Sequence, residues 1–544
     1  MKNIYIILSW AILSMFCWSC SDEKEENEKT SLVYADFLQH SLNVPSAAGE
    51  VISIVECAGV QWEIVMENNE GMITSISQKQ GGNTGEQKRY DQIKISYSEN
   101  TGLKSRTQEI FLVNKMTGER TKLVISQNPK YSPFPITLDA TTKYQYIDGF
   151  GGAHSEPQWT DGRRLTLANM ETIESLGYNI IHIYINDNGK QLWLDNIETL
   201  QDATRRGMKI FASGGITKEF REEDGVDEDG KTKYRFDHEK RDQEYAEYLA
   251  DFVTALKNKG VEIYAISMQN EPDMGPYWTP AQMTKFVKDY GHIIRATGAK
   301  ILGPEACGFD PNLTNAVVDH ADIIAGHLYQ GFMDLSSSYV KNRYNYIRSL
   351  YPEKLAPAGK TSWWMTEHLF NDGVKFPDDP TQWQWWKWDY VLSHLGQEVH
   401  MCMDAYCSAY IYFYVKRNHG LIGDGEVMSP VPVNEITKNG YILSHYAKYA
   451  LGMTRIKVET ENDKVKTTAY INEEGTEMTA VMINMEHDDF NALITAPNEI
   501  ANVSAVETTE DTNMMAAVTN LDDAYTASVL IPAKSIVSVR LKLR

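Results

Sequence analysis

The fold of this chain is decided by the stretch Val261-Glu-Ile-Tyr-Ala-Ile-Ser-Met268, which is followed directly by Gln269-Asn-Glu-Pro-Asp273. Its first part is a short apolar run of the kind that forms a buried strand, and its second part is polar and contains a proline. A second run of this kind, Ser362-Trp-Trp-Met-Thr366, leads directly into Glu367. We therefore expect two glutamates, Glu271 and Glu367, to stand where buried strands give way to loops.

Apolar runs of similar length recur at regular intervals through the middle of the chain, and amphipathic stretches separate most of them. One such stretch is 245–256, in which apolar residues recur at helical spacing. The candidate strands are 146–151, 178–185, 209–213, 261–268, 300–303, 323–328, 362–366 and 409–414. Eight strands that alternate with helices predict a (β/α)8 TIM barrel, which we place at 137–451.

The order of the strands brings the two glutamates together. Glu271 follows the fourth candidate strand and Glu367 follows the seventh. In a barrel of this type the carboxyl ends of all strands meet at one face, so both side chains should reach the same cleft. Hydrolysis of a glycosidic bond needs one carboxyl group that protonates the leaving oxygen and a second that attacks the sugar or activates water. The pair therefore indicates a glycosidase, and the alternative for either residue is a structural ion pair.

Two all-β regions flank the predicted barrel. Residues 31–130 contain short alternating runs separated by glycine and asparagine clusters, a pattern typical of a small immunoglobulin-like β-sandwich. A proline-rich linker follows at 131–136. Beyond the barrel, 452–544 returns to strand-like alternation and predicts a second β-sandwich, to which 135–145 adds a strand.

The N-terminus has the features of an export and attachment signal. A basic start, a short apolar run and a cysteine at 1–20 predict a lipoprotein signal peptide with Cys20 as the lipidated residue. Cys17 departs from the usual lipobox, so an ordinary secretory signal is the alternative. An acidic tether follows at 21–30. We expect a secreted lipoprotein on the outer membrane, at the cell surface of a Gram-negative bacterium, held there by its lipid anchor only.

The amino-acid composition limits the classes of molecule that the protein is expected to bind. The 544 residues carry a formal net charge of −22, which opposes binding to nucleic acid and to anionic membranes. The cysteines beyond the signal are scattered and show no metal-ligand spacing, so we expect no metal, no cofactor and no disulfide framework. The 12 Trp and 30 Tyr residues suit stacking on sugar rings, and equally the core of a large secreted domain. We expect a polysaccharide or oligosaccharide substrate and a monomeric protein.

Several motifs recur in order and at barrel spacing. They are Ile147-Asp-Gly-Phe-Gly-Gly-Ala153, Tyr264-Ala-Ile-Ser-Met-Gln-Asn-Glu-Pro-Asp273, Ile301-Leu-Gly-Pro-Glu-Ala306, Gly326-His-Leu-Tyr329, Trp364-Met-Thr-Glu-His368, Tyr410-Ile-Tyr-Phe-Tyr-Val-Lys-Arg-Asn-His-Gly420 and Asn439-Gly-Tyr441. By these motifs residues 133–544 resemble glycoside hydrolase family 30, and most closely its xylanase-like subfamily. The region 31–130 resembles the BACON-type modules that precede many surface glycosidases, whose role is either to bind carbohydrate or to act as a spacer.

The resemblance implies a retaining mechanism in which Glu271 is the acid/base and Glu367 is the nucleophile. It implies that burial and the nearby carboxylate raise the pKa of Glu271, while hydrogen-bond donors keep Glu367 ionised. Asn270 is then placed to hold the sugar hydroxyl next to the reacting carbon.

Further substrate contacts follow from position in the family motifs. Trp159, His327 and Tyr329 are implied near the reacting sugar, and Trp278 on the leaving-group side. Arg417 matches the arginine by which glucuronoxylan-specific members grip the glucuronate branch. The alternative for these aromatics is loop packing, and for the arginine a solvated surface position.

Several residues depart from the pattern of the glucuronate-binding members. His419, Leu369 and Phe413 stand where those members have two tyrosines and a tryptophan. Leu369 cannot donate a hydrogen bond, so the carboxylate clamp is incomplete. The third strand continues into Ser213-Gly-Gly-Ile-Thr217 in place of a Trp-Ser-Pro-Pro loop, and the second has His182 where an arginine is usual. Strict dependence on glucuronate is therefore not expected.

We predict a retaining, cell-surface glycoside hydrolase that cleaves β-linked plant polysaccharide, in the first place the xylan backbone of glucuronoxylan or arabinoxylan. One alternative is a β-glucanase or another β-glycosidase of the same family. The other is a non-catalytic surface glycan-binding lipoprotein, because a fold by itself does not imply activity.

Overall fold

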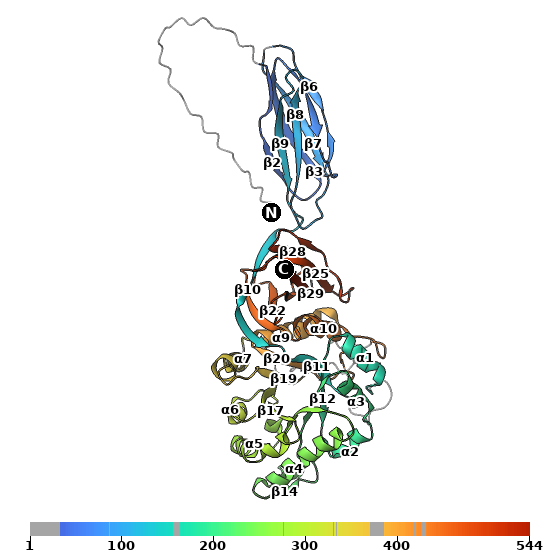
Figure 1. Ribbon diagram of the computed structural model, residues 1–544, viewed down its shortest axis with the longest axis vertical. Coiled ribbons are helices and arrows are strands. Elements are labelled where there is room, and N and C mark those ends of the chain that lie inside the picture. Colours follow the sequence, from blue (N-terminus) through green and yellow to red (C-terminus); the bar gives the residue numbers. More distant parts are fainter. Residues whose placement is uncertain are drawn as a thin grey trace, which may run out of the picture. The chain divides into compact units, whose positions relative to one another are not determined.

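The computed structural model describes residues 33–85, 87–155, 164–275, 277–329, 331–332, 334–369, 386–417, 419–425 and 431–544. The expected signal peptide with Cys20, the acidic tether and Trp159 lie outside these residues. The chain divides into two compact units, one formed by Met1–Thr101 with Ser105–Asn128 and the other by Gly102–Lys104 with Pro129–Arg544. Figure 1 shows the smaller unit in blue as a stack of strands, and the helices in the larger unit.

The smaller unit is a β-sandwich of two sheets. The first sheet has the strand order β1 (Tyr34–Phe37), β3 (Gly49–Ala58), β7 (Arg89–Tyr97) and β5 (Ile73–Ile76). The second has the order β2 (Ser41–Val44), β9 (Arg120–Gln127), β8 (Arg106–Asn114), β4 (Gln61–Met66) and β6 (Gln80–Gly82). Buried and exposed residues alternate along β7 and β8, so one face of each strand lies on the core. Trp62 is fully buried and its indole Nε1 donates to Asp91 at 3.1 Å. This tryptophan therefore packs the core.

The larger unit is built around a closed barrel of eight parallel strands, which confirms the predicted barrel. In order around the barrel they are β11 (Gly149–Ala153), β12 (Ile180–Tyr184), β13 (Lys209–Ser213), β16 (Ile263–Ser267), β17 (Lys300–Ala306), β18 (Ile323–His327), β19 (Trp363–His368) and β20 (Cys407–Tyr412). The bounds of seven of the eight strands differ by a few residues from those predicted. Two of these differences concern the site, because β17 extends to Ala306 and β19 includes Glu367. Phe211, Trp364 and smaller apolar residues fill the barrel interior.

Helices connect the barrel strands and follow them along the chain. They are α1 (Leu167–Ser175), α2 (Gly189–Leu194), α3 (Glu198–Arg205), α4 (His238–Lys257), α5 (Pro280–Arg295), α6 (Pro311–Val317), α7 (Ser338–Leu350), α8 (Trp388–Val391), α9 (Gln397–Asp404) and α10 (Lys438–Ala450), with the short turns η2 (Pro272–Met274), η3 (Tyr351–Leu355) and η5 (Leu392–Gly396). The Asp237 side chain accepts the Lys240 amide at the start of α4, as an N-cap does. The buried stripe of α4 includes Tyr245, Leu249 and Leu256, so this face lies on the core.

A ten-stranded, mainly antiparallel sheet completes the larger unit. Its order is β26 (Met515–Ala516), β25 (Ile500–Thr508), β29 (Ser535–Leu543), β23 (Glu477–Asn484), β22 (Val465–Ile471), β21 (Thr454–Glu459), β10 (Pro133–Tyr146), β24 (Phe490–Thr495), β28 (Thr526–Ile531) and β27 (Thr519–Leu521). Strand β10 pairs with both β21 and β24, so the segment before the barrel joins the sheet after it. Strands from both ends of the sheet share one core, as in a sandwich.

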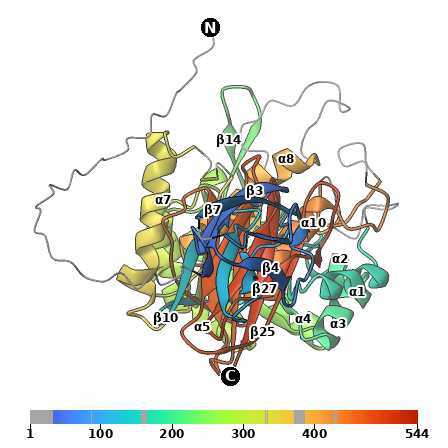
Figure 2. The same ribbon diagram turned by 90° about the horizontal axis from the view of Figure 1, so that it is seen from above.

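A hairpin of β14 (Glu222–Val226) and β15 (Thr232–Arg235) lies in the connection between β13 and α4. It is exposed along both strands and projects from the unit (Figure 2). Connections that follow barrel strands lie at the face where active sites form, so the hairpin stands on that side.

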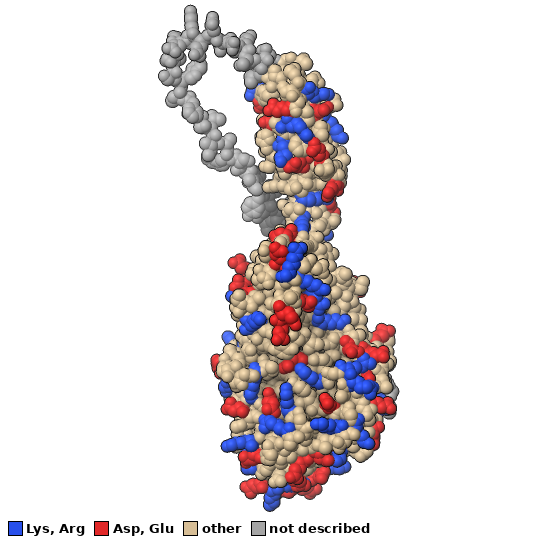
Figure 3. Space-filling model, viewed as in Figure 1, with Lys and Arg blue, Asp and Glu red and all other residues tan. Residues whose placement is uncertain are grey.

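The charged side chains do not gather by sign on the face drawn in Figure 3, where acidic and basic residues are interleaved.

Within the described ranges, no helix has the length and hydropathy needed to cross a membrane.

Candidate active site

Glu271 is placed at the mouth of the barrel by the loop that follows β16. Its backbone lies in the left-handed region with φ of 47°, immediately before η2. The Glu271 amide donates to the Glu305 carbonyl at 3.1 Å, and the Asn270 amide donates to the Gly214 carbonyl at 2.8 Å. A left-handed conformation is unfavourable for a residue with a side chain, and these two contacts to neighbouring strand ends hold it in place.

Glu367 is the penultimate residue of β19 and is 5% exposed. The Tyr184 hydroxyl donates to its Oε2, and the Tyr329 hydroxyl donates to its Oε1. Tyr184 ends β12 and Tyr329 follows β18, so the two donors approach from different sides of the barrel. Both hydrogen bonds favour the ionised form of the carboxyl group.

His327, the last residue of β18, lies between the two carboxyl groups. Its Nδ1 donates to Glu271 Oε1 at 3.0 Å. Ligand atoms of Glu271, His327 and Glu367 all lie within 4.8 Å of one another, so the nearest carboxylate oxygens of the two glutamates are no farther apart than this. Retaining glycosidases hold their carboxyl groups about 5–5.5 Å apart, whereas inverting ones leave about 6.5–9.5 Å for a water molecule. The observed separation belongs to the shorter class.

The pKa of Glu271 differs from the expected one, because His327 carries a positive charge beside it. Burial opposes a charge on His327, but Glu367, Glu271 and Glu305 outweigh it and raise the His327 pKa to about 10. Burial would raise the pKa of Glu271, yet the hydrogen bond and charge of His327 lower it below its ordinary value. The expected raised pKa of Glu271 is therefore wrong for the free protein, because the proton resides on His327.

Glu367 also departs from the expectation. Its predicted hydrogen-bond donors are present, but burial outweighs them and raises its pKa above the ordinary value. The positive charge of His327 and the hydroxyls of Tyr184 and Tyr329 limit that rise. The carboxylate thus depends on these three neighbours for its ionised form.

Among the described residues, Glu271, His327 and Glu367 form the one set of three ligand groups this close together. In the free protein His327 Nδ1 donates its hydrogen to Glu271. The arrangement is suited to holding a proton between carboxylates.

Asn270 lies beside the acid/base candidate, and its side-chain Oδ1 is buried without a hydrogen-bond partner among the described residues. A buried polar atom without a partner costs free energy, which a sugar hydroxyl bound there would recover. A hollow of about 200 Å³ adjoins it, lined by Gln269, Asn270, Glu271, Pro272, Met274, Gly275 and Tyr277. A larger cavity of about 690 Å³ lies around Trp386 and Lys438, and neither catalytic candidate lines it. We take the smaller hollow as part of the site because it contains Glu271.

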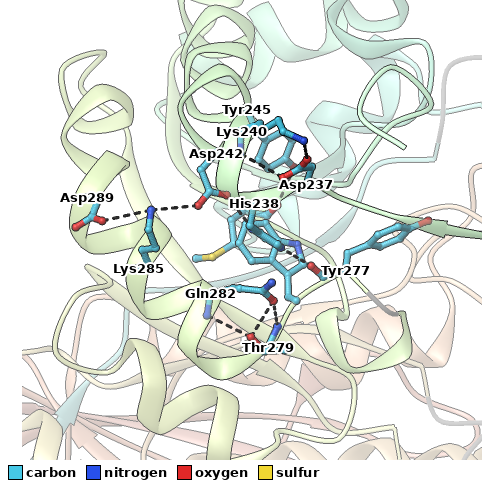
Figure 4. A network of polar contacts seen from close by, with 12 residues as sticks. Asp237, His238, Lys240, Asp242, Tyr245, Tyr277, Thr279, Gln282, Lys285 and Asp289 are labelled. Atoms are coloured by element: carbon cyan, nitrogen blue, oxygen red, sulfur yellow. Dashed lines mark hydrogen bonds and ion pairs between the residues drawn. The ribbon is translucent and has the colours of Figure 1, made fainter. Parts of the chain in front are cut away.

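Trp278, expected on the leaving-group side, has a buried side chain in the structure. Its side chain is 6% exposed and packs edge-on against His238, with ring centroids 4.5 Å apart. Figure 4 shows His238 held between Asp242 and the backbone carbonyl of Tyr277. The indole fills an aromatic cluster supplied by neighbouring helices, which is the physical reason for its burial. Tyr277, the preceding residue, is the aromatic side chain of this loop that lines the hollow beside Glu271.

Arg417 lies over Tyr414, with its guanidinium carbon 5.4 Å from the ring centroid and Nη1 3.5 Å from the hydroxyl. Tyr414 is close enough to Tyr184 for its charge to affect the Tyr184 pKa. His419 is fully buried, and burial together with His368 lowers its pKa to about 3. A neutral, buried imidazole adds no positive charge with which to bind a carboxylate.

Three further residues belong to the site and were not predicted. Tyr184 donates to Glu367, and the Ser213 hydroxyl donates at 3.0 Å to Glu305, whose Oε1 lies 3.8 Å from His327 Nε2. Each lies at the carboxyl end of a barrel strand, and that position is the one sequence signal that could have found them.

Comparison with known proteins supports the resemblance to xylanase-like members of glycoside hydrolase family 30. No family model matches the chain. The chain is 29% identical over 402 residues to the glucuronoxylanase XynC of Bacillus subtilis strain 168, covering 70% of this chain and 85% of that protein. A GH30 endoxylanase from Clostridium papyrosolvens C71 matches with a TM-score of 0.59 and 22% identity, over 75% of this chain and 100% of that chain. The family 30, subfamily 8 xylanase Xyn30A from Clostridium acetobutylicum matches with a TM-score of 0.57 and 23% identity, over 75% and 99%. The two structures show that the fold is shared.

Proposed function

We propose that this glycoside hydrolase cleaves a β-linked xylan backbone with retention of configuration, using Glu367 as nucleophile and Glu271 as acid/base. The observation that carries the proposal is the separation of the two carboxyl groups, whose nearest oxygens lie within 4.8 Å. Such a short separation is in agreement with the spacing of retaining glycosidases, in which the nucleophile attacks the sugar directly.

In the first step the Glu367 carboxylate attacks the anomeric carbon. The glycosidic bond breaks, an ester bond to Glu367 forms, and the leaving oxygen takes a proton from Glu271. Tyr184 and Tyr329 hold the two oxygens of Glu367, so the nucleophile is oriented before substrate arrives. In the second step Glu271 takes a proton from water, which attacks the anomeric carbon and releases Glu367.

The proton for the first step is stored on His327 in the free protein. Nδ1 lies 3.0 Å from Glu271 Oε1, so the proton can cross to that carboxylate and then to the leaving oxygen. When a sugar displaces water from the cleft, an ion pair becomes less favourable relative to the neutral pair. Substrate binding therefore favours protonated Glu271 and neutral His327.

The choice of xylan is supported by the relatives, which are named as a glucuronoxylanase and as xylanases. We propose that Asn270, whose Oδ1 has no partner in the described residues, holds the hydroxyl next to the reacting carbon. Arg417 then assists binding of a glucuronate branch without making it obligatory, because the Leu369 side chain has no hydrogen-bond donor and the buried His419 carries no charge.

A reducing-end assay on glucuronoxylan, arabinoxylan, β-1,6-glucan and β-1,3-glucan tests the substrate and the nucleophile together. We expect release from the xylans by the wild type and a loss of about three orders of magnitude or more in Glu367→Gln, because the amide cannot form the ester. Glu353→Gln, at an exposed position in η3, is the matched control and should retain activity.

The other outcomes separate the remaining readings. Release from a glucan alone would assign the chain to β-glucanase activity. Binding of xylan without turnover by the wild type would identify a non-catalytic glycan-binding protein. Activity that survives in Glu367→Gln would remove Glu367 from the nucleophile role.

We further propose that the protein is a monomeric lipoprotein, anchored at the outer membrane through Cys20 and the acidic tether 21–30. In this proposal the BACON-type module at 31–130 is a spacer between the anchor and the catalytic unit. The spacer role is supported by Trp62, the one tryptophan in 31–130, because its ring is fully buried and is not available for stacking on sugar.

A further inference from the structure

A row of buried polar contacts leads from the acid/base Glu271 through His327 to Glu305, and on to Ser213 and His182. We propose that Glu305 is a positioning residue that acts through His327 to keep a proton available to Glu271, and that Ser213 and His182 hold Glu305 in place. This inference rests on the hydrolase function proposed above and assigns roles to residues on two strands whose sequences depart from the family pattern.

Glu305 contacts both the proton carrier and the backbone of the acid/base. Its side chain is fully buried at the end of β17. Oε1 accepts a hydrogen bond from Ser213 Oγ at 3.0 Å and lies 3.8 Å from His327 Nε2. The Glu305 backbone carbonyl accepts the Glu271 amide at 3.1 Å. A change at Glu305 therefore reaches Glu271 by two routes, one through charge and one through the backbone.

His182 completes this row of contacts from the neighbouring strand β12. Its ring stacks on Phe211 with centroids 4.2 Å apart, and Nε2 lies 2.6 Å from Ser213 Oγ. Ser213 has one hydroxyl hydrogen, which it donates to Glu305, so its oxygen accepts from His182. That assignment requires a hydrogen on Nε2 of His182, as in one neutral tautomer. Burial and the positive His327 lower the pKa of His182 well below its ordinary value, in agreement with a neutral ring.

Glu305 is the neighbour of His327 whose carboxylate takes no part in the proposed reaction. The titratable groups that face His327 from the elements around it are Glu271, Glu305, Glu367, His182, His368 and Tyr329. In the proposed reaction Glu271 takes and gives a proton and Glu367 forms an ester, so both lose their charge during the cycle. Glu305 is the carboxylate among these groups that lies behind His327 and undergoes neither change.

The two oxygens of Glu305 have unequal surroundings. Oε1 has Ser213 and His327 as neighbours, whereas Oε2 is buried without a hydrogen-bond donor in the part of the chain that the structure describes. The 3.8 Å separation from His327 Nε2 is too long for a hydrogen bond and still brings the two charges close. The interaction is therefore electrostatic, and it depends on the charge of Glu305 more than on its shape.

Glu305→Gln tests this role because the amide keeps the size of the side chain and an acceptor for Ser213 while removing the charge. Without that charge His327 loses its proton more readily, so the basic limb of the pH profile of kcat/KM should move to lower pH by about one unit. At a pH above the limb, kcat/KM of the variant should then be about tenfold lower than that of the wild type. Glu305→Asp keeps the charge and should keep the wild-type limb. Glu353→Gln is the control for an exposed carboxylate.

NMR titration of the His327 ring gives a readout that does not depend on turnover, with its signal identified by its absence in His327→Gln. We expect His327 to lose its proton at lower pH in Glu305→Gln than in the wild type. This shift remains measurable even if xylan is not hydrolysed, which separates the failure of the proposed function from the failure of this inference.

The proposal would be overturned if His327 lost its proton at the same pH in Glu305→Gln as in the wild type, or if the variant lost activity by the same factor at every pH. If Glu305→Gln does not fold, Ser213→Ala leaves the Glu305 carboxylate in place and removes the hydrogen bond that Ser213 donates to it, together with the contact between Ser213 and His182. That variant should give a smaller shift of the His327 titration in the same direction, and no shift would overturn the proposal equally.

Discussion

The two glutamates are held by different kinds of neighbour, and the difference matches the tasks proposed for them. Glu367 receives two phenolic hydroxyls, which orient both of its oxygens and favour its charge. Glu271 faces one imidazole, with which it can exchange a proton. A nucleophile needs a fixed charge and an acid/base needs a mobile proton, so each environment suits one role.

Tyr329→Phe removes one of the two donors to Glu367. Because this hydrogen bond lowers a pKa that burial raises, its loss should raise the Glu367 pKa further. Glu367 attacks only when ionised, so the acidic limb of the kcat/KM profile should move to higher pH. Tyr346→Phe, which loses an exposed hydrogen bond to Asn315, is the matched control. An acidic limb at the same pH in Tyr329→Phe and the wild type would contradict this account of Glu367.

At the scale of elements, the loop that carries Glu271 is fastened to the start of α4. His238 Nδ1 lies 2.8 Å from Asp242 Oδ1, and Nε2 contacts the Tyr277 carbonyl (Figure 4). The same ring packs on Trp278 in the aromatic cluster. The helix thus holds the loop through a side chain that sequence patterning does not distinguish from other buried histidines.

His238→Ala should lower the free energy of unfolding by about 2–3 kcal/mol, because it removes two buried hydrogen bonds and leaves their acceptors without a donor. Urea denaturation measures this change, and kcat/KM should fall as well because the loop bearing Glu271 is less firmly placed. His292→Ala, at an exposed position on α5, is the matched control. Equal and small effects of the two substitutions would show that His238 does not anchor the loop.

The elements differ in how well they could be predicted. All eight barrel strands followed from apolar runs bounded by polar residues, since a buried parallel strand needs both. The hairpin β14–β15 was missed because its strands are exposed and charged and carry no apolar alternation. The last residues of β17 include Pro304 and Glu305, which are poor strand formers, so the prediction ended this strand at residue 303 and gave Glu305 no role in the site.

At the scale of the whole molecule, the site is produced by contacts between strands that are distant in sequence. The glutamates themselves could be predicted because strand ends meet at one face of a barrel. Their charges could not, because His327 approaches Glu271 across 56 positions of the chain and reverses the expected direction of its pKa. The burial of Trp278 could not be predicted for a similar reason, since its partner His238 on α4 approaches it only when the chain folds.

The stereochemistry of hydrolysis tests the central claim most directly, because it depends on how the closed barrel spaces Glu271 and Glu367. Proton NMR of the anomeric signals in the first minutes of xylo-oligosaccharide hydrolysis shows which anomer is released before mutarotation mixes them. With the nearest carboxylate oxygens within 4.8 Å, we predict that the β-anomer appears first. Initial release of the α-anomer would contradict the retaining, two-carboxylate mechanism.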